Sequence, residues 1–260
     1  MSEPPRACNG SEALCARALS EIAIAVAHNA MNVEAEGWLL PNQHLGYEDQ
    51  VVDGIRGFML DVHDDAGVAT LCHGDCGLGS EPLLDALIRL RLLLEARPYD
   101  VFVLILQDEI EPPGIVDAFE ASGLLPRVIG GIEPWPTLSQ LIAADTRLLV
   151  THEGARPDAP AWYHATYELA WDNDYAAASV EDFGCDVLRG DRGHEVFLLN
   201  HFLTNPLASE ALAAEANPAD VLLEHIERCE AEAGQRVDWI AVDFYDVGDV
   251  LSVVESLNQR

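Results

Sequence analysis

Short apolar runs alternate with amphipathic stretches along nearly the whole chain. Apolar runs bounded by turn residues are typical of buried strands, and leucines at helical spacing indicate helices. We expect eight strands, over residues 22–27, 57–62, 68–72, 101–107, 147–151, 164–169, 196–200 and 239–243. We expect helices over 81–96, 137–144 with Thr137 as its cap, 218–233 and 247–257, and a short helix with a Pro-rich loop within 108–135.

Strands and helices in this order predict an α/β fold, a distorted TIM-type (β/α)8 barrel that forms a single domain over residues 1–260. Only the turn from Asp64 to Gly67 separates the second strand from the third. That spacing suits an antiparallel hairpin and leaves no room for a crossover helix, so the barrel should be irregular there. Residues 1–20 are expected to be an N-terminal extension, closed by a disulfide.

The composition excludes several classes of protein. Hydrophobic residues make up 49% of the chain, which excludes a disordered protein. No apolar stretch approaches the roughly 20 residues of a transmembrane helix. The first residues contain no apolar signal region, so either a leader has been removed or the protein is not exported by that route.

The charge is strongly acidic, with 45 acidic residues against 14 basic ones, a net charge of −31. The chain has no lysine, which excludes a Walker-type phosphate loop and Schiff-base catalysis. Without a basic surface we expect no nucleic-acid partner. We also expect at most weak, calcium-dependent membrane contact, because anionic bilayers repel an acidic protein. The oligomeric state is left open.

The chain has six cysteines, an even number, and four of them form two closely spaced pairs. This spacing predicts the disulfides Cys8–Cys15 and Cys72–Cys76 and, by elimination, Cys185–Cys229. Disulfides indicate an extracellular or periplasmic protein, whereas free buried thiols in a cytoplasmic protein are the alternative. A zinc site made of Cys72, His73 and Cys76 is a further, weaker hypothesis.

Two histidines lie where strands end. His28 follows the first strand and His73 follows the third. A (β/α) barrel gathers the carboxyl ends of its strands at one mouth, so we expect these side chains to converge. Two imidazoles can supply a general base and a general acid near neutral pH, which makes the chain a candidate phosphodiesterase. Asp243 ends the last strand and is expected to accept a hydrogen bond from His28 and fix its tautomer.

Oxygen-bearing side chains end the neighbouring strands. Asn29, Asp61 and Asp108 offer only oxygen ligands, which favours Ca²⁺, and Mg²⁺ less, over zinc. Such an ion could neutralise a phosphate oxygen in the transition state.

The order of these motifs resembles the X region of phosphatidylinositol-specific phospholipase C, in the bacterial and fungal secreted branch of PLC-like phosphodiesterases. The matching segments are 27–31, 41–43, 54–64, 71–76, 135–138, 171–173, 197–204 and 241–246. The resemblance implies a distorted TIM-type barrel with His28 as general base and His73 as general acid. It also implies attack of an inositol 2-hydroxyl on phosphorus, with a cyclic phosphate as product, and it places Asn29 and Asp61 at metal-binding positions.

The chain departs from that family pattern at three places. Met59 and Gln107 stand where metal-dependent relatives often have carboxylates, and no Arg stands at the strand end where metal-independent relatives use one. Weak metal binding, binding through Asp108, and no metal therefore all remain open. So do two other functions: hydrolysis of a glycerophosphodiester or sphingolipid, and a catalytically weak binding protein on the same barrel.

Overall fold

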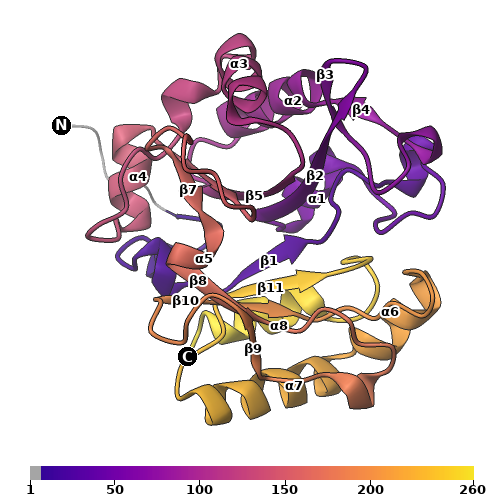
Figure 1. The fold of residues 1–260 in the computed structure, drawn as a ribbon. Coiled ribbons are helices and arrows are strands. Elements are labelled where there is room, and N and C mark those ends of the chain that lie inside the picture. Colours follow the sequence, from indigo (N-terminus) through magenta and orange to yellow (C-terminus); the bar gives the residue numbers. More distant parts are fainter. Residues whose placement is uncertain (1–6) are drawn as a thin grey trace. The chain divides into compact units, whose positions relative to one another are not determined.

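The computed structural model describes residues 7–260 and divides into two compact units, which are described separately (Figure 1). Unit 1 comprises residues 7–22 and 58–165, and unit 2 comprises residues 23–57 and 166–260. Residues 1–6 of the expected N-terminal extension lie outside the described residues. The expectation of one domain over the whole chain stays a prediction.

Unit 1 contains a sheet with strand order β7-β6-β5-β2, in which β5, β6 and β7 run parallel. The strands are β2 (Gly57–Asp65), β3 (Val68–Leu71), β4 (Glu81–Pro82), β5 (Phe102–Asp108), β6 (Leu148–His152) and β7 (Tyr163–Ala165). The helices are α2 (Leu83–Ala96), α3 (Pro112–Ser122) and α4 (Leu138–Ala144), with short 3-10 turns at Glu12–Leu14, Leu19–Glu21, Cys76–Leu78 and Leu125–Arg127. Strand β5 is buried over nearly its whole length, as the apolar run 101–107 predicts.

The predicted hairpin is confirmed. Strands β2 and β3 pair antiparallel, with Val62 opposite Leu71 and Asp65 opposite Val68. The turn places Ala66 and Gly67 at φ 53° and 86°, the two left-handed residues of a type I′ turn. Asp64 accepts a hydrogen bond from the Gly67 amide at 2.7 Å, which holds this turn. Helix α4 begins after Thr137, whose hydroxyl accepts from the Gln140 amide, so the predicted cap is also confirmed.

Unit 2 contains a sheet with strand order β1-β11-β10-β8-β9. Its strands are β1 (Ile24–Ala27), β8 (Ala170–Asn173), β9 (Val187–Arg189), β10 (Val196–Asn200) and β11 (Trp239–Val242), all parallel except the pair β8/β9. Its helices are α1 (Tyr47–Asp53), α5 (Thr166–Leu169), α6 (Glu210–Ala216), α7 (Ala219–Ala233) and α8 (Val250–Leu257), with 3-10 turns at Glu34–Glu36 and Val180–Asp182. Trp171 stacks on Phe197 at 3.7 Å in the core of this unit.

The sixth predicted strand, 164–169, is wrong. Its first residues end β7, and Thr166–Leu169 form the short helix α5. The strand of unit 2 is the next segment, Ala170–Asn173, which is fully buried although it ends in Asp172 and Asn173. Arg189 and Asn200 donate hydrogen bonds to the Asp172 carboxylate, and these partners allow polar residues in a buried strand. The hydrophobic pattern of the sequence therefore could not reveal the strand Ala170–Asn173.

Among the described helices none is long and apolar enough to cross a membrane. The six cysteines form the three predicted disulfides, Cys8–Cys15, Cys72–Cys76 and Cys185–Cys229, which rules out the alternative of free thiols in this structure.

A buried arginine makes a testable contribution to the stability of unit 1. Arg147 donates hydrogen bonds to the carbonyl oxygens of Leu94, Arg97 and Asp100 at 2.9–3.1 Å, and so ties the end of α2 to the start of β6. We expect Arg147→Leu to lower the free energy of unfolding by about 2–4 kcal/mol, because buried carbonyls lose their donors. Chemical denaturation measures this. Arg260→Leu, which removes an exposed arginine, is the control, and an equal loss in both variants would contradict the assignment.

Candidate functional site

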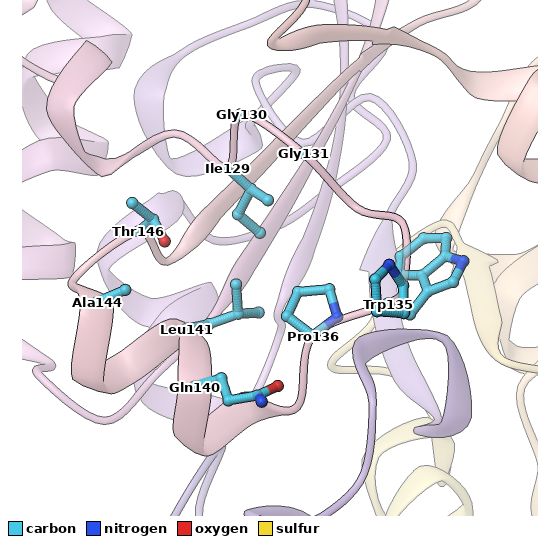
Figure 2. Close-up of a pocket in the computed structure, with 10 residues that line it drawn as sticks. Ile129, Gly130, Gly131, Trp135, Pro136, Gln140, Leu141, Ala144 and Thr146 are labelled. Atoms are coloured by element: carbon cyan, nitrogen blue, oxygen red, sulfur yellow. The ribbon is translucent and has the colours of Figure 1, made fainter.

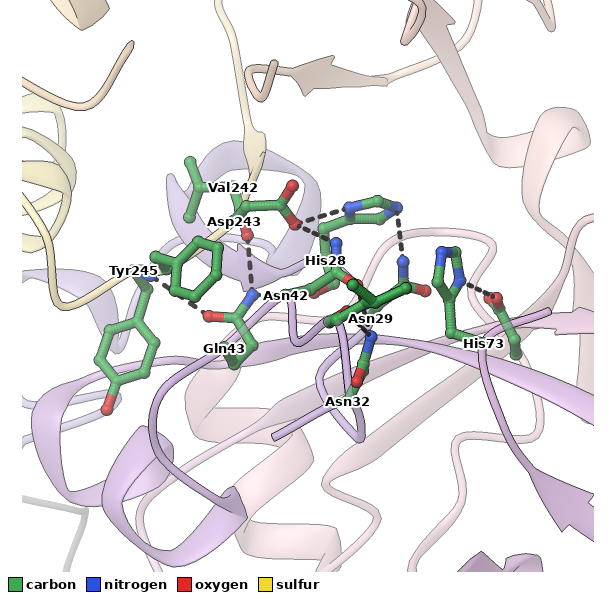
Figure 3. A network of polar contacts seen from close by, with 12 residues as sticks. His28, Asn29, Asn32, Asn42, Gln43, His73, Val242, Asp243 and Tyr245 are labelled. Atoms are coloured by element: carbon green, nitrogen blue, oxygen red, sulfur yellow. Dashed lines mark hydrogen bonds and ion pairs between the residues drawn. The ribbon is translucent and has the colours of Figure 1, made fainter. Parts of the chain in front are cut away.

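The first candidate site lies in unit 2, where β1 and β11 end side by side. Ala27 pairs with Val242, and the His28 amide donates to the Val242 carbonyl at 3.0 Å, so the register continues past both strands. This pairing places His28 next to Asp243, and His28 Nδ1 lies 2.9 Å from Asp243 Oδ1 (Figure 3). The predicted contact between the Asp243 carboxylate and a ring nitrogen of His28 is therefore present in the structure.

The Asp243 carboxylate is held in turn from a second direction. Asn42 donates its side-chain amide to Asp243 Oδ1 at 2.9 Å, and Asn32 donates to Asn42 Oδ1 at 2.8 Å. Gln43 donates to the carbonyls of both His28 and Val242 at 2.8 and 3.0 Å. The loop after Pro41 therefore fixes both the carboxylate and the backbone beneath the histidine (Figure 3). Sequence reasoning missed these roles, although the segment 41–43 stood among the matching motifs.

The hydrogen-bond partners fix the tautomer of His28. A carboxylate only accepts hydrogen bonds, so Nδ1 carries the proton and Nε2 keeps a lone pair. The side-chain nitrogen of Asn29 lies 3.3 Å from Nε2, and Phe202 stacks on the ring with centroids 3.9 Å apart. The side chain of His28 remains 19% exposed. The arrangement gives an oriented imidazole whose accessible nitrogen can accept a proton.

The second candidate site lies in unit 1, at the β2–β3 hairpin. His73 Nδ1 lies 3.0 Å from Asp61 Oδ2, and the Cys72–Cys76 disulfide closes the loop that carries His73. The carboxylate is nearly buried whereas the histidine is half exposed. Asp61 was predicted as a metal ligand, and the structure gives it a second role as the partner of His73. Cys72 and Cys76 bond to each other, so the zinc hypothesis for Cys72, His73 and Cys76 is wrong in this disulfide-bonded form.

Asp108 ends β5 in unit 1 and faces an arginine. Its Oδ2 accepts a hydrogen bond from Arg156 Nε at 3.0 Å, and a second Arg156 nitrogen contacts the Asp108 carbonyl. This hydrogen bond raises the pKa of the Arg156 guanidinium above its usual value. Arg156 lies in the loop after β6, which is why inspection of strand ends missed it. Arg56, the arginine nearest the second strand, instead donates to the Val51 and Ile55 carbonyls and is buried.

The three predicted metal ligands differ in how well their side-chain oxygens could bind a hard cation. Asn29 contacts His28 through its nitrogen, and Asp61 contacts His73 through one oxygen, which leaves each an oxygen for a cation. Asp108 fits poorly because a guanidinium already neutralises its carboxylate. Calcium binding therefore stays a proposal, for which Asn29 in unit 2 and Asp61 in unit 1 are each a candidate ligand.

Two further histidines, one after a strand and one within a helix, are buried. His201, after β10, and His225, on α7, have Nδ1 atoms 2.9 Å apart, and Phe183 stacks on both rings. Burial, with His225 as the second cause, lowers the pKa of His201 to about 3, and burial lowers that of His225 to about 4. Both rings are therefore neutral at neutral pH.

Ten residues line a surface pocket in unit 1, and none of the predicted site residues is among them (Figure 2). Trp135 and Pro136 form one side, and Leu141 of α4 with Thr146 forms another. The pocket lies at the amino end of β6, whereas Asp61 lies within β2, Asp108 is the last residue of β5 and His73 follows β3. It is separate from the candidate site.

The comparison with known proteins decides the family. A family model described as PI-PLC X matches residues 14–258. The chain belongs to this family. It is 26% identical to an uncharacterized secreted protein of Arthroderma benhamiae, over 94% of this chain and 61% of that one. It is also 26% identical to a PI-PLC X domain-containing protein of Arabidopsis thaliana, over 89% of this chain and 60% of the relative. The chain thus spans about three fifths of these two relatives.

Solved structures show the same fold as this PI-PLC X protein. Two structures of the phosphatidylinositol-specific phospholipase C of Staphylococcus aureus match with TM-scores of 0.65 and 0.68 at 14% identity. The matches cover 93% and 95% of this chain and 94% of each of those chains. The likeness confirms the predicted fold class, an α/β barrel of the distorted TIM type found in phospholipase C-like phosphodiesterases.

Proposed function

We propose that this protein is a phosphoric diester hydrolase of the phospholipase C type, in which His28 is the general base and His73 the general acid. The observation that carries the proposal is that both histidines have the same arrangement. Each Nδ1 lies about one hydrogen-bond length from a carboxylate, Asp243 for His28 and Asp61 for His73. A carboxylate at Nδ1 orients the ring and stabilises the imidazolium form, and it leaves Nε2 for proton transfer.

The proposed reaction is an intramolecular transfer on a phosphodiester whose alcohol has a neighbouring hydroxyl. His28 Nε2 takes the proton of that hydroxyl while its oxygen bonds to phosphorus. The bond from phosphorus to the leaving oxygen breaks, and His73 gives that oxygen a proton. The products are a cyclic phosphate and a free alcohol, which for phosphatidylinositol are inositol cyclic phosphate and diacylglycerol. Water as the attacking group, as for a glycerophosphodiester or sphingolipid, gives no cyclic phosphate, so product analysis separates these candidates.

The proposal includes calcium as an aid, with Asn29 and Asp61 each as a candidate oxygen ligand; the ion would neutralise a phosphate oxygen. We expect Asp61→Asn and Asn29→Ala each to raise the calcium concentration needed for half-maximal activity by about tenfold or more. Loss of a residue that only hydrogen-bonds to a metal ligand already weakens metal affinity by about that factor, and loss of a ligand should weaken it at least as much. A calcium titration of activity measures this. Full activity of the wild type in excess chelator would contradict the calcium proposal and would make Arg156 the first cation to test.

We also propose an extracellular location and a weak affinity for anionic membranes. The three disulfides and the relative named as secreted support the location. A chain with net charge −31 and no lysine should bind anionic vesicles weakly in low salt with chelator. It should turn over soluble or zwitterionic phosphodiesters better than phosphatidylinositol in such vesicles.

Vesicle co-sedimentation tests this membrane prediction. The loop residues Leu39 and Leu40 are 60% and 50% exposed, whereas Trp38 is buried. Leu39→Ser with Leu40→Ser removes the apolar side chains, and the charge is unchanged. The prediction would be contradicted if the wild type bound anionic vesicles tightly without calcium. If the variant then lost this binding, the apolar loop would be the part of the protein that binds the membrane despite the net negative charge.

A further inference from the structure

A buried cluster in unit 2, outside the candidate catalytic groups, brings two cysteines and a histidine together. Cys185 precedes β9, and His225 and Cys229 lie four residues apart on α7, so both face the same side of that helix. One nitrogen of His225 and the two sulfurs lie within 4.8 Å of one another, and all three residues are buried. In this structure the two sulfurs are joined as a disulfide.

The neighbouring His201 holds the ring of His225 in place. The two rings make three polar contacts: His201 Nε2 with the Ala216 carbonyl at 2.8 Å, the two Nδ1 atoms at 2.9 Å, and His225 Nε2 with the Gly184 carbonyl at 3.3 Å.

The contact partners place His225 Nε2 beside the sulfurs. Nε2 lies 3.3 Å from the Gly184 carbonyl oxygen, and Cys229 Sγ lies 3.8 Å from the same oxygen. The second nitrogen of the ring, Nδ1, contacts His201, and His201 contacts the Ala216 carbonyl. Histidines that bind metals commonly donate their second nitrogen in this way.

We propose that reduction of the Cys185–Cys229 disulfide converts this cluster into a site for a thiophilic divalent cation such as Zn²⁺. Its ligands are the sulfurs of Cys185 and Cys229 and Nε2 of His225, and His201 positions the His225 ring. Zinc–sulfur bonds of about 2.3 Å in a tetrahedral site separate two sulfurs by roughly 3.8 Å. Metal and disulfide therefore exclude each other. The site does not depend on the proposed phosphodiesterase activity.

A phosphine can serve as the reductant of the Cys185–Cys229 disulfide. The phosphine attacks one sulfur and, with one water molecule, becomes a phosphine oxide, while the two protons of the water pass to the sulfurs. Binding of the divalent ion as a bis-thiolate then releases two protons. A phosphine is preferred to a dithiol in the test because a dithiol competes for zinc.

Cobalt is the spectroscopic probe for the full-length chain. The phosphine-reduced protein should bind one equivalent of Co²⁺ with a thiolate-to-cobalt absorption band, and the oxidised protein should show no band. Cys229→Ser should abolish the band, and His201→Gln should weaken cobalt affinity by about 10–100-fold. The matched control, Cys8→Ser with Cys15→Ser, removes a different disulfide and should keep the band. A reduced wild type without a thiolate band, or a band that the control loses, would overturn the proposal.

Alkylation of the reduced wild type gives a second test that needs no variant. One equivalent of Zn²⁺ should protect Cys185 and Cys229 from a thiol-alkylating reagent, and it should leave Cys8, Cys15, Cys72 and Cys76 reactive. Mass spectrometry of peptides measures each cysteine. Equal alkylation of all six cysteines with and without zinc would overturn the proposal even if the variants fail to fold.

Discussion

Replacement of Asp243 by Asn is expected to lower kcat on the order of a thousandfold or more, while the fold is kept. The carboxylate only accepts hydrogen bonds, so it holds the proton on His28 Nδ1 and leaves Nε2 as a base. The amide of Asn can donate to Nδ1 instead, which stabilises the tautomer protonated at Nε2. That tautomer cannot accept a proton, and the same change at a serine-protease triad costs a comparable factor.

A matched pair of residues controls for the effect of charge. Asp246 Oδ2 lies 2.9 Å from Nδ1 of His44 in the same unit, which reproduces the Asp243–His28 contact outside the proposed machinery. Asp246→Asn should leave kcat close to that of the wild type. Steady-state kinetics with thermal unfolding measures both variants. Equal activities of Asp243→Asn and Asp246→Asn would contradict the role of Asp243.

His28→Ala and His73→Ala are each expected to reduce kcat/KM by about a hundredfold or more, the usual contribution of a general base or acid. Each variant removes the imidazole that is proposed to transfer a proton and leaves a small side chain, so folding should be little affected. His28 is stacked on Phe202 and His73 lies on a disulfide-closed loop, and neither forms the core of its unit. His44→Ala is the control, because it removes a histidine with the same kind of carboxylate partner.

The double variant tests whether the two histidines act on one substrate. If both serve one reaction, the combined loss should be smaller than the product of the two single losses, because residues that act as a unit are not additive. Strictly multiplicative losses would indicate independent roles, and normal activity in either single variant would contradict the mechanism.

The sequence predicts the fold class and most elements because the chain follows local rules. Apolar runs such as the one that becomes β5 are buried, and Thr137 caps α4 as its residue type predicts. The hairpin follows from the short turn before Val68. The strand Ala170–Asn173 was missed because its polar residues are buried through distant partners, and no local pattern shows such partners.

For the candidate site, the sequence gives the residues at the strand ends but only some of their contacts. The Asp243–His28 pair follows from the expected neighbourhood of the first and last strands. The support from Asn42 and the stacking of Phe202 come from loops whose course no strand pattern determines. The contact between Asp108 and Arg156 is of the same kind, and it changes the charge of a predicted metal ligand.

Phosphorus-31 NMR of the products tests the central claim most directly. The wild type is incubated with calcium and with phosphatidylinositol in uncharged detergent micelles, so that the charge of a bilayer does not limit access. We expect a cyclic phosphodiester as the first phosphorus-containing product, and we expect it to be absent with His28→Ala and with Asp243→Asn. No turnover by the folded wild type of this or any soluble phosphodiester, or an acyclic phosphate as the first product, would contradict the account.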